Sequence, residues 1–507
     1  MTTLRATYAL YVDWNDDGDF DDAGEDISAD WIRIAITSGY SSPFARYPTV
    51  GRMTVLLKNA AKTYSPPETA TARPRLPVKL TMAYGGTTKT IFTGWIQTLR
   101  PDYGSRLARR AVMECVDAIW LLDQFDGEIA LMTNTYADDI ITRVVDAVYT
   151  PPATAYQNGI NLFPTAADRW TGQLVWALTA INQGAGVMQR VNASGKIQDA
   201  CTSDWGRFFV SKAGVPTYYN RHKMPFDSTT ALTLDDDMVG LDYGMSADDV
   251  RNYIEVTCHP RKIGEVNEVL GQLDQNDAPM IEDGASVTFD IAFRDPANNA
   301  VQLGGLSVVT PVATTDFAVT DDEAGEGTDD TASITPAMTA YGDHAEITLN
   351  NAAGHPVWVQ TLRVRGLAVR SSESVTVVAS EASDVVQRLR VDAALMSSAI
   401  DAQSLAAWLL SYYKDPLHNI QGVTIFANST ATLMAAVRDL ELMNRVEITE
   451  TQTGLSAQVG YIYAMRHTIE RGRIHRLEFN MEQAYDYGAD PFTIDTSRLD
   501  GADVLVY

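Results

Sequence analysis

Residues 78–99 read VKLTMAYGGTTKTIFTGWIQTL, and this stretch decides how the first part of the chain folds. Apolar and β-branched residues alternate with polar ones in 78–84 and again in 90–99, which is typical of half-buried strands. Gly85-Gly86 stand between the two runs, and paired glycines accept the positive φ angles of a tight hairpin turn. The sequence therefore predicts an antiparallel hairpin closed at these two glycines.

The rest of the first 110 residues repeats this pattern. Three more runs of β-branched or alternating residues occupy 7–14, 32–38 and 52–59. Gly, Pro and Asn residues separate the runs, as expected between strands. We therefore expect the N-terminal part to be β-rich.

Helical patterns begin after residue 110 and return near the C-terminus. We expect helices at 111–125, 134–148, 194–204, 402–413 and 430–440. The second has a capping residue and early acids at its start and Pro151-Pro152 after its end, and Gly206 is placed to end the third. The chain is therefore expected to be mainly β with some α, an α+β protein.

Changes in pattern along the chain predict five segments. They are a β-rich N-terminal domain at 1–110, an α+β segment at 111–277, a β-sandwich at 278–380, a C-terminal α+β segment at 381–487 and a tail at 488–507. The sandwich is expected because residues 278–380 are almost entirely of strand pattern. At 507 residues the chain is long enough for about three domains.

The composition excludes several classes of protein. The chain has 39 Lys and Arg against 65 Asp and Glu, a net charge of −26, which disfavours binding to phosphate groups of nucleic acid or anionic membranes. Cys115, Cys201 and Cys258 lie far apart and form no CxxC pair, which disfavours a disulfide framework or a thiolate zinc site. We expect neither a signal peptide nor a membrane span, because no apolar run approaches the roughly 20 residues that a span needs.

The acidic charge is concentrated in part of the chain. Between Arg294 and Arg363 there is no Lys or Arg, while ten Asp and Glu residues lie there. The core of this stretch, TDDEAGEGTDDTAS at 320–333, is small and acidic, so we expect a solvated, mobile loop, with binding of an ion or a partner as the alternative.

One pattern points to a metal ion. Residues 13–21 read DWNDDGDFD and place oxygen-bearing side chains at alternate positions around Gly18, as in calcium loops. The position where an EF-hand carries its bidentate Glu is Gly24 here. The candidate ligands are Asp13, Asn15, Asp17, Asp19, Asp21, Glu25 and Asp26. We expect a structural calcium ion; the alternative is an acidic turn whose side chains cap its own backbone.

Motifs of catalysis are absent from the sequence. There is no G-x-S-x-G, H-E-x-x-H or G-x-G-x-x-G, and GGTTKT at 85–90 lacks the spacing of a phosphate loop. Residues 474–481 alternate as in a half-buried strand, and His467 and His475 are expected to meet across a hairpin as ordinary strand residues. The sequence therefore predicts no enzyme, although 65 acids always offer some carboxylate pair.

The order of segments resembles a protein family. The segments that carry the resemblance are LYVDWNDDGDFDDAGEDIS (10–28), FTGWIQTLRPDYGSRLARRAVMECVDAIWLLDQF (92–125), KIQDACTSDWGRFFVSKAGVPTYYNRHK (196–223), VRNYIEVTCHPR (250–261), AEITLNNAAGHPVWVQTLRVRGLAV (345–369), and NRVEITETQTG (444–454) with GYIYAMRHTIERGRIHRLEFNME (460–482). In this order they resemble the minor tail proteins that form the tail-tip or baseplate hub of tailed bacteriophages. The resemblance covers roughly residues 5 to 485.

The resemblance implies a structural role in the virion tail, after synthesis in the host cytoplasm. It implies two barrel-like hub domains and an inserted β-sandwich, assembled as a homotrimer that joins a hexameric tail tube to a threefold tip. The implied partners are tail tube and distal tail proteins, the tape measure protein, and tail fibre or tip proteins. DNA would only pass through the channel, and neither sequence-specific nucleic acid nor membrane is an expected partner.

Two alternatives stay open from the sequence. One is a distal-tail or receptor-binding protein whose β-sandwich contacts host glycans, and the other is a cell-wall hydrolase. A receptor-binding sandwich would expose aromatic residues such as Trp358, whereas a hub is expected to bury this residue in its strand.

Overall fold

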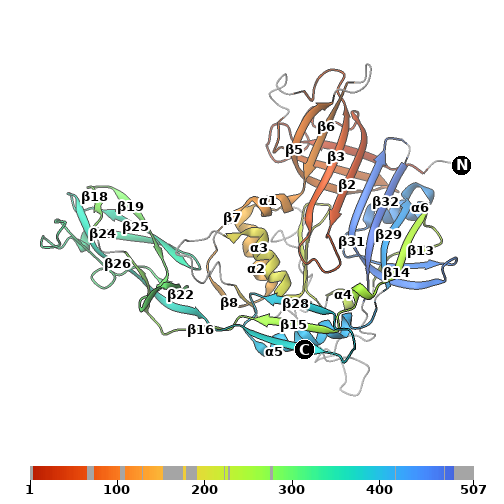
Figure 1. The fold of residues 1–507 in the computed structure, drawn as a ribbon. Coiled ribbons are helices and arrows are strands. Elements are labelled where there is room, and N and C mark those ends of the chain that lie inside the picture. The colour runs from red at the N-terminus through yellow and green to blue at the C-terminus, as the bar shows by residue number, and fades with distance from the viewer. Residues whose placement is uncertain are drawn as a thin grey trace, which may run out of the picture.

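The computed structural model describes residues 4–65, 73–102, 109–127, 129–151, 175–177, 191–221, 223–226, 229–273, 278–416, 418–472 and 474–484. The described part is mainly β, as the sequence predicts, with short helices. It forms a body made from both ends of the chain and an arm made from its middle (Figure 1). No helix in these residues is long and apolar enough to cross a membrane.

A 12-stranded sheet forms most of the body. Its N-terminal strands are β1 (Thr7–Val12), β2 (Trp31–Gly39), β3 (Thr49–Lys58), β4 (Pro77–Tyr84), β5 (Thr87–Asp102) and β6 (Arg110–Val116). Its later strands are β13 (Thr230–Asp235), β14 (Gly240–Met245), β29 (His418–Phe426), β30 (Arg445–Glu450), β31 (Leu455–Glu470) and β32 (Ile474–Gln483). One continuous apolar core lies under both groups of strands, so the two ends of the chain share a folding unit.

The hairpin predicted from residues 78–99 is confirmed. β4 and β5 pair antiparallel, and Tyr84 faces Thr87 across the turn. Gly85 and Gly86 both have positive φ, 61° and 81°, as a primed two-residue turn requires. The glycines therefore set the register of the hairpin.

The helix predicted at 111–125 is wrong in its first half. Residues up to Val116 form β6, which pairs with both β3 and β5. Apolar residues at 111, 113 and 115 suit a strand as well as a helix, and the two neighbouring strands decide between them. Helix α1 (Ala118–Gln124) starts only after Asp117, whose carboxylate accepts a hydrogen bond from the Ile119 N–H.

Helices α1, α2 (Ala137–Val148) and α3 (Ala193–Asp204) pack together on a second apolar core beside the sheet. The predicted helices at 134–148 and 194–204 are thus confirmed with small changes of boundary. Trp205 ends α3 in the left-handed conformation, and the chain continues into the hairpin β11 (Arg207–Val210) and β12 (Pro216–Tyr219). Short strands β7 (Asp126–Gly127), β8 (Met132–Thr135), β9 (Val175–Ala177) and β10 (Val191–Asn192) and helix α4 (Lys223–Phe226) complete this region.

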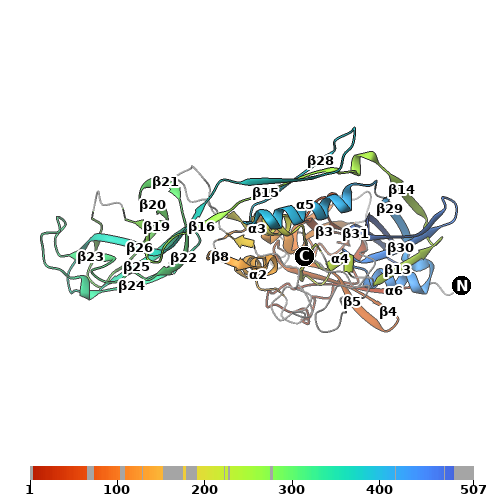
Figure 2. The same ribbon diagram turned by 90° about the horizontal axis from the view of Figure 1, so that it is seen from below.

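A three-stranded sheet carries the longest described helix. The sheet consists of β15 (Tyr253–Cys258), β27 (Val375–Ser380) and β28 (Arg388–Ala393), and α5 (Ala399–Tyr413) packs on one of its faces (Figure 2). Thus β27 belongs to the body, although it falls inside the range 278–380 expected for the sandwich. Helix α6 (Ala431–Asp439) contacts β4 of the large sheet.

The arm is a sandwich of two sheets around one apolar core. Its larger sheet contains β16 (Arg261–Ile263), β17 (Glu268–Gln272), β18 (Met280–Ile281), β22 (Gly304–Val309), β23 (Phe317–Thr320) and the long central β26 (Val357–Ser371). Its smaller sheet contains β19 (Ser286–Ala292), β24 (Ile334–Ala340) and β25 (His344–Asn351), and β20 (Arg294–Asp295) pairs with β21 (Asn298–Gln302). The arm extends to one side of the body (Figure 1), which gives the molecule an elongated shape.

The two ends of the chain meet where β2 pairs with β31. The register runs from Arg33 opposite Glu470 to Gly39 opposite Ala464. Gly39 has φ +118°, and a Cβ atom there would lie 2.3 Å from the Tyr463 carbonyl oxygen. Only glycine therefore fits at this end of the junction.

We expect Gly39→Ala to destabilise the body by about 2 kcal/mol or more, because it adds both a clash and an unfavourable backbone conformation. Gly195→Ala is a matched control, since Gly195 lies in α3 with no atom within 4 Å of the new methyl group. The control is expected to be neutral or slightly stabilising. Urea unfolding of both variants measures this, and equal stabilities would contradict the close packing at Gly39.

Candidate functional site

The predicted calcium loop connects β1 to β2 and folds back along the free edge of β1. The Val12 N–H donates to the Glu25 carbonyl at 3.0 Å, and the Ile27 N–H donates to the Leu10 carbonyl at 2.9 Å. These bonds satisfy backbone groups that an edge strand would otherwise expose. The loop is therefore an extension of the first sheet with its two ends held together.

Asp13 and Glu25 stand at the two ends of the loop, and both are buried. The Asp13 carboxylate accepts hydrogen bonds from the backbone N–H groups of Asp16 at 2.5 Å and Gly18 at 3.0 Å. The Glu25 carboxylate accepts from Trp14 at 3.2 Å and Asp22 at 3.1 Å. Burial raises the pKa of Glu25, because a buried carboxylate loses hydration.

Three of the seven predicted ligands come together. Carboxylate oxygens of Asp13, Asp17 and Glu25 all lie within 4.8 Å of one another. Asn15 joins the group indirectly, since its amide donates to Asp17 at 2.8 Å and to Asp22 at 2.6 Å. Gly24, at the position where an EF-hand carries its bidentate Glu, has no side-chain ligand. Glu25, one residue later, brings its carboxylate to the group instead.

The other three predicted ligands lie outside this group. Asp19 and Asp21 are exposed, and the Asp19 carboxylate accepts from the Asp21 N–H at 3.1 Å. A hydrogen bond with the Asp19 side chain raises the pKa of Asp21. Asp26 is also exposed, and its carboxylate accepts from the Ser28 N–H at 2.9 Å.

The donor set fits a hard divalent cation in part. Oxygen is the preferred ligand atom of calcium, and three carboxylates with a backbone loop around them can supply several oxygens. The same carboxylates already cap the loop's own N–H groups, as the alternative interpretation expects. The geometry is therefore compatible with both interpretations.

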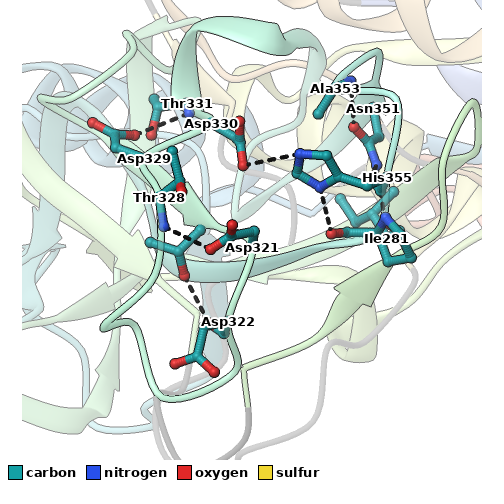
Figure 3. A network of polar contacts seen from close by, with 12 residues as sticks. Ile281, Asp321, Asp322, Thr328, Asp329, Asp330, Thr331, Asn351, Ala353 and His355 are labelled. Atoms are coloured by element: carbon teal, nitrogen blue, oxygen red, sulfur yellow. Dashed lines mark hydrogen bonds and ion pairs between the residues drawn. The ribbon is translucent and has the colours of Figure 1, made fainter.

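The acidic segment at 320–333 is held by specific contacts. Figure 3 shows Asp321 accepting from the Thr328 N–H at 2.6 Å, and Asp330 facing His355 at 3.5 Å. The Gln360 amide of β26 also donates to the Thr320 hydroxyl at 3.0 Å. Most of the segment is exposed, so the expectation of a solvated loop is confirmed. Its carboxylates also organise its own backbone, and the Gln360 amide ties it to β26.

His467 and His475 meet across the β31–β32 hairpin, as predicted. The His467 Nδ1 and His475 Nε2 atoms are 2.9 Å apart, and the Tyr8 hydroxyl lies 2.7 Å from His475 Nδ1. Burial lowers the pKa of His475 to about 3 and that of His467 well below its ordinary value, with the Lys212 charge acting in the same direction. Both rings are thus neutral core groups that link β1 to the last hairpin.

A buried ion pair was not predicted from the sequence. The Arg207 guanidinium on β11 donates to the Glu482 carboxylate on β32 at 2.5 Å, and both side chains are buried. The same guanidinium donates to the carbonyls of Pro43 and Ala45 and lies over the Tyr40 ring. Arg207 and Glu482 are 275 residues apart in the sequence, so no local sequence pattern could have predicted that they pair.

Trp358 on β26 is half-buried rather than buried, because the flanking Val357 and Val359 take the core side of the strand. The prediction that this residue would be buried is wrong. Its position alone therefore does not separate a hub from a receptor-binding protein.

We expect the histidine pair to make the body sensitive to acid. Below pH 6.5 the two histidines bind protons in the unfolded chain but stay neutral in the folded chain, because their pKa values are lowered there. Each ring therefore lowers the free energy of unfolding by up to about 1.4 kcal/mol for each unit by which the pH falls. The double variant His467→Phe, His475→Phe should therefore lose less stability between pH 7.5 and pH 5 than the natural chain. Urea unfolding at both pH values measures this; parallel losses would contradict it.

Comparison with known proteins finds similarity only in structure. No protein-family model and no curated protein matches the sequence. A tail protein from Neisseria meningitidis MC58 superposes with a TM-score of 0.48 at 10% identity, over 94% of this chain and 96% of that chain. The 43 kDa tail protein of prophage MuSo2 from Shewanella oneidensis superposes at 0.45 and 10% identity, over 94% and 97%. Prophage tail protein gp18 from Listeria monocytogenes EGD-e superposes at 0.41 and 6% identity, over 94% of each chain.

Proposed function

We propose that this chain is a structural component of a bacteriophage tail, the trimeric central hub of the tail tip or baseplate. In this role it joins the tail tube to the threefold tip and forms part of the channel through which DNA leaves. It performs no catalysis. Its partners are further copies of itself and the neighbouring tail tube, distal tail, tape measure and tip proteins.

The observation that carries this proposal is the interleaved architecture of the body. The resemblance in sequence implies two hub domains built from distant segments and an inserted sandwich. In agreement with this, β2 pairs with β31, and the arm of residues 261–371 is inserted between β14 and β29, two paired strands of the same sheet. An insertion of this kind leaves the body continuous, so the arm can vary without disturbing a ring.

The charge of the chain also supports a channel protein. A net charge of −26 repels DNA phosphates, so DNA can pass such a surface without binding to it. A ring would further be expected to have heterologous contacts between neighbours and closed symmetry.

The oligomeric state tests the hub proposal. We expect sedimentation of the purified full chain to give three times 55.5 kDa, and particle images to show threefold symmetry around an axial channel. In the virion, labelled antibodies to the arm should mark the tail axis. A monomer in solution together with labelling at fibre ends would contradict the hub and favour the receptor-binding alternative.

We also propose that the loop between β1 and β2 holds a structural calcium ion through Asp13, Asp17 and Glu25. Without a cation, three carboxylates within 4.8 Å of one another repel, and two of them are buried. A bound ion would neutralise this charge and hold the loop along the edge of β1. The other predicted ligands, Asn15, Asp19, Asp21 and Asp26, would orient or surround the group.

Thermal unfolding in EDTA and in millimolar calcium tests this site. We expect calcium to raise the melting temperature by on the order of 5 °C, because it binds the folded state alone. Asp17→Asn should abolish the shift, and it is chosen because Asp17 is exposed and its loss should not unfold the chain. Asp26→Asn is the matched control and should keep the shift; equal melting with and without calcium in the natural chain would exclude the ion.

A further inference from the structure

The free edge of β1 is covered along only part of its length. The backbone of Leu10 faces away from β4, since its carbonyl accepts from the Ile27 N–H at 2.9 Å and its N–H donates to the Ser28 hydroxyl at 2.9 Å. The pairing of β1 with β4 is regular and backbone direction alternates along a strand, so the groups of Tyr8 face the same side. Among the described residues nothing bonds to the Tyr8 N–H or carbonyl. Tyr8 therefore offers a donor and an acceptor at an open strand edge.

A cavity of about 520 Å³ lies beside this uncovered edge. Residues 6–8 line one side of it. Residues 28–29, where the covering loop turns toward β2, and residues 470–472, between β31 and β32, line other sides. The volume is in the range of sites that bind small ligands or single side chains of a partner.

The interior of the cavity is aromatic and apolar. The Tyr8 ring lies edge-on to the Trp31 ring, with 6.0 Å between the ring centroids. Met434 of α6 and Ile474 of β32 add to the apolar lining, and Ile474 is 41% exposed. A large apolar side chain bound here would leave water together with these surfaces, which is favourable.

The rim of the cavity carries more positive than negative charge. Arg5 and Arg471 are exposed there, and Glu470 is the one acid among the described lining residues. The Arg471 guanidinium donates to the carbonyls of Ala29 and Trp31 and lies over the Trp31 ring, which holds it in place. Arg5 has no charged partner among the described residues. In a chain of net charge −26 such a rim is an exception, and it favours an acidic occupant.

We propose that an extended acidic peptide segment of another protein binds here as an added strand on β1. Its backbone pairs with the N–H and carbonyl of Tyr8, and an acidic side chain meets Arg5 and Arg471. Alternate side chains of an added strand point the same way as Tyr8, so one large apolar residue enters the cavity. The site is defined by the edge, the cavity and the rim, so it does not depend on the hub assignment.

Selection from a bead-displayed library of random ten-residue peptides on the purified full chain supplies the probe. We expect the selected peptides to be acidic and to carry one large apolar residue among β-branched ones. The strongest binder is labelled with a dye, and its Kd is measured by fluorescence anisotropy. Selection of no peptide, or of basic peptides, would overturn the proposal.

Variants at the edge and at the rim test how the labelled peptide is held. Ala6→Pro should weaken binding at least tenfold, because proline removes a donor and places its ring at the edge, whereas Ala6→Ser keeps the N–H and should bind normally. Arg5→Glu should weaken binding about tenfold at low salt, and Arg363→Glu, at an exposed position of the arm, should not. Urea unfolding of each variant verifies that it is folded.

Equal affinity of all these variants for the peptide would overturn the proposal. Dissociation of the natural oligomer in Ala6→Pro would assign the edge to a second copy of this chain and would also overturn it. A natural chain that is monomeric in solution leaves the expected peptide binding unchanged, so this proposal and the hub proposal fail separately.

Hydrogen exchange of the full chain locates the backbone contact. The bound peptide should slow exchange of the Tyr8 amide by about tenfold or more and leave the Thr7 amide, which faces β4, unchanged. Mass spectrometry with fragmentation of the peptide containing residues 4–12 resolves the two amides. Equal exchange of the Tyr8 amide with and without the peptide would overturn the added strand.

Discussion

The pairing of β2 with β31 is the constraint on which the rest of the body depends. It joins residues 33–39 to residues 464–470, so the large sheet cannot form until both ends of the chain have been made. Contacts of such sequence separation cost much chain entropy, which the shared apolar core must offset. The fit of Gly39 against the Tyr463 carbonyl shows how closely the two backbones approach.

The helical layer is fastened to the same sheet by charge. Arg207 follows α3, and its ion pair with Glu482 ties this layer to the last strand of the sheet. Since burying two charges costs hydration, the pair needs the additional carbonyl acceptors of Pro43 and Ala45. Removing one partner would leave the other charge buried and unpaired, which is strongly destabilising.

The acidic residues of the chain have different structural roles in different places. In the loop after β1, Asp13 and Glu25 are buried and cap backbone N–H groups. In the arm, Asp321 and Asp330 organise a segment against β26 and His355. Acidic residues at both places thus have a local structural role in holding the backbone.

Local sequence patterns were sufficient to predict the elements whose conformation depends little on contacts with other parts of the chain. The turn at Gly85-Gly86, the helix at 194–204 and the alternation of 474–481 could all be predicted, because turn chemistry and periodicity are properties of consecutive residues. Residues 111–116 could not be predicted, since strands β3 and β5 on either side select the extended form.

The sequence by itself determined that the chain is mainly β, where its acids are concentrated and which residues could hold a cation. Only the tertiary structure decided that Asp13, Asp17 and Glu25 converge while Asp19, Asp21 and Asp26 do not. The physical reason is that convergence depends on the return of the loop along β1, which is fixed by hydrogen bonds between backbones. The partnership of Arg207 with Glu482 has the same origin, because folding alone brings such distant residues together.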